Sequence, residues 1–314
     1  MSDTLAAHEP ECADGSSDSI ELVIAARPRD LGTFVVRRAL PSTRRRLIGP
    51  FIFFDHMGPV RLPAGIGMDV RPHPHIGLAT VTYLFEGEID HRDSLGSTQT
   101  IRPGDVNWML AGRGIVHSER SGPESRAAGP SIHGIQSWVA LPLEDEQAEP
   151  HFVHHASATI PTVQLDGARL DVVAGTAYGQ RSPVGVSSPT LYVHARLEAG
   201  ARVPVDSTHE ERALYVVDGS LSCDGLTFTA GTMLVLRPGA NVTMAAEHAA
   251  RVMLVGGARL AGERNIFWNF VSSSNERIER AKDDWTKGRF PKVPGDDVEF
   301  TPLPERPTPS KTTA

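Results

Sequence analysis

Short apolar runs separated by Gly, Pro and Asp dominate the chain from residue 20 to about residue 140. The runs are about five residues long and rich in β-branched and aromatic side chains, which is typical of strands joined by turns. They lie at residues 20–24, 32–36, 51–54, 78–85, 99–101 and 106–110. Strands of this length at this spacing indicate a sandwich or barrel rather than alternating strands and helices.

A second block of the same character extends from about residue 159 to residue 260, with runs at residues 170–174, 191–197, 213–217, 226–228, 233–236 and 252–255. In each block an aromatic-led run ends in an acidic residue and a glycine, at residues 83–87 and 215–219. A small residue and a glycine then open a later run in both blocks. The approximate repeat predicts two copies of one β-barrel.

The two ends of the chain differ from these blocks. Residues 1–18 are polar and acidic and are expected to form a disordered tail. The first barrel is expected at 19–150, the second at 151–262, and a C-terminal segment at 263–314. In that segment Ser273 and Glu276 have the spacing of a capping box, and apolar residues recur at helical spacing up to Trp285. We therefore expect an all-β protein with a short C-terminal helix and an extended tail that packs back on the barrels.

Composition narrows the functional classes. The formal net charge of −7 argues against a nucleic-acid-binding surface. Two cysteines give no disulfide framework, which fits a reducing compartment. The first 18 residues lack the basic start and apolar core of a secretion signal, and no apolar run approaches the roughly 20 residues that span a bilayer. A cytoplasmic location without membrane contact is expected.

Two pairs of metal-ligand side chains occur in the first block with the same spacing. One residue separates His73 from His75, and one separates His117 from Glu119. Alternate residues of a strand point to one side of the sheet, so each pair presents two ligands to one face. Two such pairs on neighbouring strands can converge on one ion, and their coincidence with Gly-rich turns between them is specific. The four residues predict a single mononuclear metal site.

These motifs resemble the cupin superfamily and, more narrowly, the pirin family. The resemblance covers roughly residues 20–295 and is densest over 45–140. It is carried by residues 49–55, 73–87, 103–109, 112–119, 134–139 and 269–274. One position departs from the pattern, because many relatives have Glu four residues after the second histidine, where this chain has Ala79.

The resemblance implies a bicupin whose N-terminal barrel holds a metal through three histidines and one glutamate. Those roles fall on His73, His75, His117 and Glu119, and Ala79 reinforces Glu119 as the acidic ligand. One divalent ion is expected, Fe(II) before the alternatives Mn, Ni, Cu and Zn. Imidazole and carboxylate ligands without thiolate suit iron, manganese, nickel or copper, whereas zinc would more often close a structural site at four ligands.

The second barrel is expected to hold no metal. Its nearest counterparts to the first ligand pair are His209 and Glu211, but residues 239–244 offer no ligand where a late histidine should fall. Two side chains rarely hold a metal unaided, so a structural role for His209 is favoured.

The resemblance also implies an activity, since several pirins act as quercetin 2,3-dioxygenases that open the flavonol ring with O2 and release CO. A small aromatic or enol-type substrate and O2 are then expected, with Glu119 as metal ligand and catalytic proton acceptor. These two roles compete, because coordination lowers the basicity of a carboxylate. Phe53, Trp108, Met109 and Trp138 are candidates to line the pocket, with ordinary core packing as the alternative for each. His56, next to Asp55, is the candidate to orient a metal ligand.

Two other hypotheses remain open at this stage. The chain could be a metal- or redox-responsive regulator that acts through a protein partner, as a transcriptional co-regulator or a modulator of a metabolic enzyme. It could also keep its metal for stability alone, although a metal with open coordination positions stabilises a fold less well than one that the protein coordinates fully. The sequence does not fix the oligomeric state, and the resemblance favours a monomer, because pirin-like chains are often monomers whose two barrels cover each other's faces.

Overall fold

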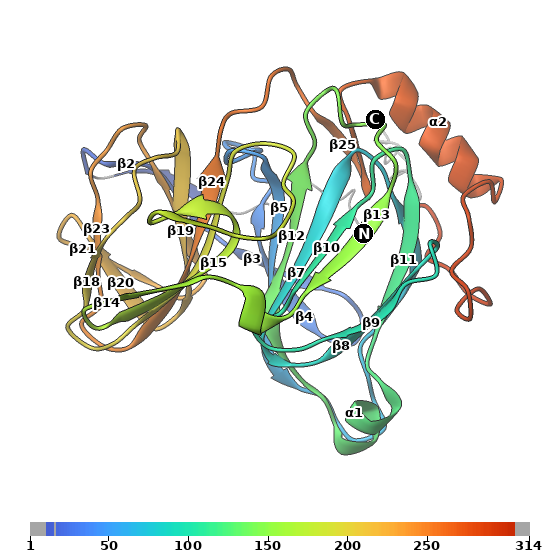
Figure 1. The fold of residues 1–314 in the computed structure, drawn as a ribbon, viewed down its shortest axis with the longest axis horizontal. Helices are drawn as coiled ribbons and strands as arrows, with labels where there is room; N and C mark the ends of the chain where they lie inside the picture. Colours follow the sequence, from blue (N-terminus) through green and yellow to red (C-terminus); the bar gives the residue numbers. More distant parts are fainter. Residues whose placement is uncertain (1–10, 16, 305–314) are drawn as a thin grey trace, which may run out of the picture.

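The computed structural model describes residues 11–15 and 17–304, which form two β-barrels side by side (Figure 1). The strands of the first barrel are β3 (Arg27–Asp30), β4 (Val35–Leu40), β5 (Phe51–Arg61), β6 (Asp69–His75), β7 (Leu78–Gly87), β8 (Ile89–Asp93), β9 (Thr98–Ile101), β10 (Val106–Leu110), β11 (Ile115–Arg120), β12 (Ser131–Ala140) and β13 (His151–His155). The strands of the second barrel are β1 (Glu11–Asp14), β2 (Ile20–Ala25), β14 (Thr162–Leu165), β15 (Ala168–Ala177), β16 (Gln180–Arg181), β17 (Thr190–Leu197), β18 (Arg202–Pro204), β19 (Glu211–Asp218), β20 (Ser220–Cys223), β21 (Leu226–Thr229), β22 (Thr232–Leu236), β23 (Thr243–Ala245) and β24 (Ala250–Gly257). The remaining elements are α1 (Pro123–Ala128), a 3-10 turn (Ser157–Thr159), the hairpin β25 (Asn265–Phe267) and β26 (Phe270–Ser272), and α2 (Asn275–Thr286).

Each barrel consists of one large and one small sheet. In the first barrel the orders are β13-β10-β7-β12-β5-β4-β3 and β6-β11-β8-β9. In the second they are β1-β2-β22-β19-β24-β17-β15-β14, with β16 attached to β15, and β18-β23-β20-β21. The predicted all-β architecture, two barrels with a short C-terminal helix, is confirmed.

The large sheets pack against each other, and strand β7 shows how the sequence achieves this. Its odd-numbered residues Ala79, Val81 and Tyr83 lie in the apolar core shared by the two barrels. Its even-numbered residues face the opposite way, and Thr82 contacts Glu119 inside the first barrel. Because side chains alternate along a strand, one sheet serves both the core and the site.

The structure departs from the expected domain limits at both ends of the first barrel. Strand β2, expected at the start of the first barrel, pairs with β22 of the second. Strand β13, expected to open the second barrel, pairs with β10 of the first. The expected disordered tail is also wrong at Glu11–Asp14, which forms β1 by pairing with β2. Backbone pairing across the chain therefore supplies order that the polar side chains alone do not indicate. Residues 1–10 of that tail and 305–314 of the C-terminal tail lie outside the described ranges.

The helix α2 begins one residue later than the capping box predicted. Ser274, not Ser273, caps it by accepting a hydrogen bond from the Arg277 backbone N–H. Ser273 instead donates to the buried carboxylate of Glu146, which also accepts from the Ser273 backbone N–H. A tertiary contact thus selects the cap from a run of serines that local sequence cannot distinguish.

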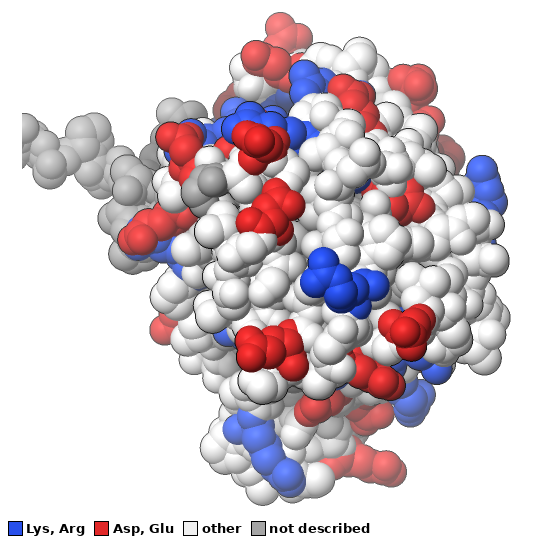
Figure 2. All heavy atoms as spheres, turned by 90° about the vertical axis from the view of Figure 1, so that its left-hand side faces the viewer, with Lys and Arg blue, Asp and Glu red and all other residues white. Residues whose placement is uncertain are grey.

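Acidic and basic side chains are interspersed on the face of the second barrel that Figure 2 shows. Among the residues that the structure describes, no helix is long and apolar enough to cross a bilayer.

Candidate metal centre

The predicted ligand pairs lie on neighbouring antiparallel strands, β6 and β11. His117 stands directly opposite His73, and Ile115 stands opposite His75. Pro74 is tolerated between the two histidines because β6 is the edge strand of its sheet. The ladder shifts register between His117 and Glu119.

The structure brings His73, His75 and His117 together inside the first barrel. One ring nitrogen of each lies within 4.8 Å of those of the other two, and all three side chains are buried. The Nε2 atoms of His75 and His117 are 3.1 Å apart. Two nitrogens that bind one ion at right angles from about 2.1 Å lie about 3 Å apart, so this pair fits a shared metal. The cluster can hold one metal ion.

Burial also gives these imidazoles the protonation state that a metal requires. It lowers the pKa of His73 to about 4 and holds the pKa values of His75 and His117 well below the ordinary value. The three rings are therefore neutral at pH 7. His73 donates from Nδ1 to the Arg71 carbonyl at 2.9 Å, which leaves its Nε2 lone pair for an ion.

Glu119 lies outside this three-nitrogen cluster but lines the same cavity as His73 and His75. Its side chain is buried, and burial raises the pKa of its carboxyl. The Thr82 hydroxyl lies 3.2 Å from Glu119 Oε1 and 2.9 Å from Gln136 Oε1. A cation nearby would offset the cost of ionising this buried carboxyl.

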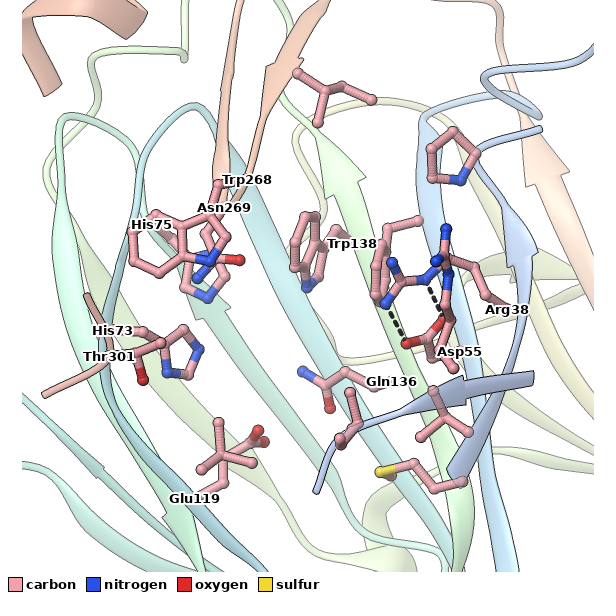
Figure 3. A pocket seen from close by; sticks show the side chains of 18 of the residues that line it. Arg38, Asp55, His73, His75, Glu119, Gln136, Trp138, Trp268, Asn269 and Thr301 are labelled. Carbon is pink, nitrogen blue, oxygen red and sulfur yellow. Dashed lines mark hydrogen bonds and ion pairs between the residues drawn. The ribbon is translucent and has the colours of Figure 1, made fainter. Parts of the chain in front are cut away.

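The cavity beside the histidines has a volume of about 690 Å³. Figure 3 shows His73, His75 and Glu119 on one side of it, with Arg38 and Asp55 on the other. Phe53 and Trp138, two of the predicted pocket residues, line it. Their rings stack at 4.0 Å, and the Arg38 guanidinium lies 4.4 Å from the Phe53 centroid while it forms a two-point ion pair with Asp55.

Three other predicted side chains do not line this cavity. Trp108 packs in the core between the barrels, because the even-numbered residues of β10 face the second barrel. Met109 packs behind Phe53 and Trp138. His56 faces the second barrel, where its Nδ1 lies 3.1 Å from the Tyr215 hydroxyl, so the expectation that it orients a metal ligand is wrong. Side chains alternate between the two faces of a strand. Asp55, the neighbour of His56 on β5, therefore lines the cavity while His56 faces away from it.

Residues from distant segments, which were not predicted from the sequence, also reach the cavity. The C-terminal segment contributes Trp268, Asn269 and Thr301 (Figure 3). The Thr301 backbone N–H donates to the Pro72 carbonyl at 2.9 Å, next to the predicted ligand His73. The aromatic residues Phe267, Trp268 and Phe270, just before the helix, indicate in the sequence that the segment packs on the barrels, but they do not specify where it docks.

In the second barrel, His209 and Glu211 make structural contacts. His209 Nε2 donates to the Thr176 carbonyl at 2.7 Å. Glu211 accepts from the Gly49 backbone N–H at 2.7 Å and from Arg259 at 3.0 Å. These contacts support the structural role expected for His209.

Comparison with known proteins agrees with this architecture. The family model for Pirin matches residues 33–139, and that for the Pirin C-terminal cupin domain matches residues 192–291. A pirin-like protein of Caulobacter vibrioides is 48% identical over 289 residues, which span 91% of this chain and 100% of that protein. A Pseudomonas aeruginosa protein with the provisional name quercetin 2,3-dioxygenase is 36% identical over 94% of both chains. The crystal structure of a quercetin 2,3-dioxygenase from Acinetobacter baumannii has a TM-score of 0.84 and 35% identity, and covers 91% of this chain and 95% of that one. The chain therefore belongs to the pirin family.

Proposed function

We propose that this protein is a metal-dependent dioxygenase that opens the heterocyclic ring of flavonols such as quercetin. Flavonol and O2 are converted into a ring-opened product and carbon monoxide. The observation that carries the proposal is that two ligand histidines, His73 and His75, face a cavity of about 690 Å³ with aromatic walls. A cavity of this size accepts a flat molecule of several rings. The names of the similar proteins from Pseudomonas aeruginosa and Acinetobacter baumannii support the reaction class.

The proposed resident metal is Fe(II), with Glu119 as the fourth protein ligand. Nitrogen and oxygen donors without thiolate suit iron, although they also suit manganese, nickel and copper. When bound, the ion would supply Lewis-acid chemistry that lowers the pKa of a coordinating enol hydroxyl. Of the two buried carboxylates that line the cavity, Asp55 is paired with Arg38 on the far side, whereas Glu119 lies on the side of His73 and His75 and would complete the set (Figure 3).

The protein's own residues would bind and orient the substrate. Trp138 and Phe53 give the cavity an apolar wall for planar rings. Gln136 accepts from Thr82 through Oε1, so its amide N–H groups are available to a substrate oxygen. Arg38, held by Asp55, places guanidinium N–H groups at the far side, where they can meet a hydroxylated ring. Trp268 and Thr301 cover the cavity and would limit the access of water.

The regulatory alternative is less favoured by this geometry. A site that only signals the state of its metal to a partner needs no substrate-sized cavity beside the ligands, whereas catalysis does. The proposal includes a cytoplasmic location, which the small number of cysteines supports.

The decisive experiment measures the bound metal of the purified protein and follows quercetin absorbance and CO release under air. Protein loaded with Fe(II) is expected to turn over quercetin, and His117→Ala is expected to lose metal and turnover together. His248→Ala, which removes an exposed histidine of the second barrel, is the control and should match wild type. No turnover with iron, manganese, nickel or copper would refute the dioxygenase assignment.

A further inference from the structure

Two further buried residues, His91 and Asp93, lie next to the ligand His117. His91 and Asp93 lie on β8, which pairs with β11 so that Asp93 is opposite His117. His91 Nδ1 is 3.4 Å from His117 Nδ1, and His91 Nε2 is 3.1 Å from Asp93 Oδ2. His91 is 4% exposed and Asp93 is fully buried, so water does not replace these contacts.

The carboxylate of Asp93 fixes the order of the protons in this chain. Its Oδ1 accepts from the backbone N–H groups of Leu95 and Ser97 at 2.9 and 3.1 Å. Its Oδ2 can only accept, so His91 must present Nε2–H to it. In the neutral imidazole of His91, Nδ1 is then a bare acceptor, so His117 presents Nδ1–H to it.

The consequence appears at the opposite nitrogen of the His117 ring. With the proton on Nδ1, the Nε2 lone pair is free, and it is this Nε2 that lies 3.1 Å from His75 Nε2. The Phe152 ring stacks on His91 at 4.3 Å with an interplanar angle of 10°, which restricts rotation of the His91 ring. His73 is oriented differently, by a single backbone carbonyl.

We propose that Asp93 and His91 are positioning residues that hold His117 in its metal-binding tautomer through two successive hydrogen bonds. This inference rests on the metal site of the proposed function but not on its dioxygenase chemistry. A hydrogen-bonded carboxylate behind a ligand imidazole fixes the ring and increases its basicity, and loss of such a partner typically weakens metal binding 10- to 100-fold.

The substitution Asp93→Asn tests the proton order. Two backbone N–H groups already face Oδ1, so the new amide will turn its oxygen towards them and its NH2 towards His91 Nε2. His91 must then accept at Nε2 and carry its proton on Nδ1, which faces His117 Nδ1. The Nδ1–H groups of His91 and His117 would then face each other, unless the His117 proton moves to Nε2, the nitrogen that binds the metal.

The measurement uses the full chain loaded with Zn(II), a diamagnetic probe. We expect 15N–1H spectra of the imidazole rings to show His91 as Nε2–H in wild type and as Nδ1–H in Asp93→Asn. The Zn(II) affinity of the variant, from chelator competition, should fall about 10- to 100-fold while the melting temperature of the metal-free protein stays unchanged. An affinity within about twofold of wild type overturns the proposal, as does an equal loss of metal-free stability.

Two matched substitutions of His91 test the proposal even if Asp93→Asn fails to fold. His91→Gln keeps an acceptor for His117 Nδ1–H and should retain most of the Zn(II) affinity, whereas His91→Leu removes it and should not. Equal affinities of the two variants would overturn the proposal. Failure of the dioxygenase assignment is distinguishable, because absence of quercetin turnover by wild type leaves these Zn(II) affinities unaffected.

Discussion

Glu119 differs from the three histidines in how burial affects its charge. Burial lowers the pKa of the histidines and raises the pKa of Glu119, so it disfavours charge in all four side chains. For the histidines this is the state that binds a metal, whereas the carboxylate binds best when ionised. Glu119 is therefore the residue at which ligand and base functions can be separated by substitution.

Glu119→Gln is expected to weaken Fe(II) binding by more than about 100-fold. The loss of a direct ligand should weaken binding more than the loss of a residue that only hydrogen-bonds to a ligand. Quercetin turnover at saturating iron should also fall by about 100-fold or more, since an amide cannot accept the substrate proton. Metal titration and steady-state kinetics check both expectations, with the exposed Glu144→Gln as the control. Wild-type iron affinity with lost turnover would show that Glu119 is a base and not a ligand.

The sequence predicts the role of an individual residue well when that role follows from local spacing. His73, His75 and His117 were identified because two strands with alternate side chains suffice to bring them together. The facing direction of His56 and Trp108 was not accessible, since it depends on which side of the sheet the second barrel covers. His91 and Asp93 were missed because the pairing of β8 with β11, which brings them to His117, is a tertiary contact that the sequence pattern does not specify.

The most informative element is the C-terminal strap, defined here as residues 290–304. Thr301 contacts the carbonyls of Arg71 and Pro72 on the ligand strand β6. Arg120 of β11 forms an ion pair with Asp296 at 2.7 Å. The strap thus contacts both strands that carry the proposed metal ligands, and α2 anchors it through Trp285, whose indole N–H donates to the Thr301 carbonyl at 3.0 Å.

Trp285→Ala should loosen the strap without unfolding the barrels. Trp285 packs against Trp268, Phe290 and Phe300, so its loss is expected to cost about 2 kcal/mol locally, less than for a fully buried tryptophan. We expect faster proteolytic cleavage within residues 290–304 and a raised KM for quercetin at nearly unchanged kcat. Glu279→Ala on the same helix is the control. Cleavage at the wild-type rate would contradict this role of the strap.

Elements were predictable where the local pattern is strong. Residues 106–110 were predicted as a strand and form β10 with the same limits. By contrast, the edge strand β1 is polar and depends on pairing with β2, a tertiary contact that its own sequence does not encode.

The two barrels meet through buried histidines as well as through apolar side chains. His56 lies 3.1 Å from the Tyr215 hydroxyl and 3.0 Å from His133 Nε2, and Tyr83 lies 3.0 Å from His194 Nδ1. Burial lowers the pKa of His56 to about 2 and lowers the pKa values of His133 and His194. The interface therefore depends on histidines that remain neutral.

Low pH should reduce the free energy of unfolding through the histidines of this interface. Unfolding returns the His56 pKa from about 2 to the ordinary value of about 6.5, so the unfolded chain binds one more proton between these values. Stability is full above pH 6.5 and falls by about 1.4 kcal/mol per pH unit for His56 as the pH decreases towards 4. Denaturant unfolding of the metal-free protein should show a shallower pH dependence for His56→Gln, whereas His248→Gln should keep the wild-type slope. Identical slopes would exclude His56 as a source of acid sensitivity.

The N-terminal strands β1 and β2 belong to the second barrel, so no single cut in the chain separates the two barrels. Strand β2 precedes the first barrel in the chain but completes the sheet of the second, while β13 follows the first barrel and completes its sheet. A recombination event that cut the gene once between the barrels would separate β2 from β22 and leave the second barrel with an unpaired sheet edge, which favours aggregation. Replacement of the second barrel requires matching segments from two separate regions of the gene, residues 11–25 and 162–257. The second barrel is thus retained together with the first even though the metal ligands lie in the first.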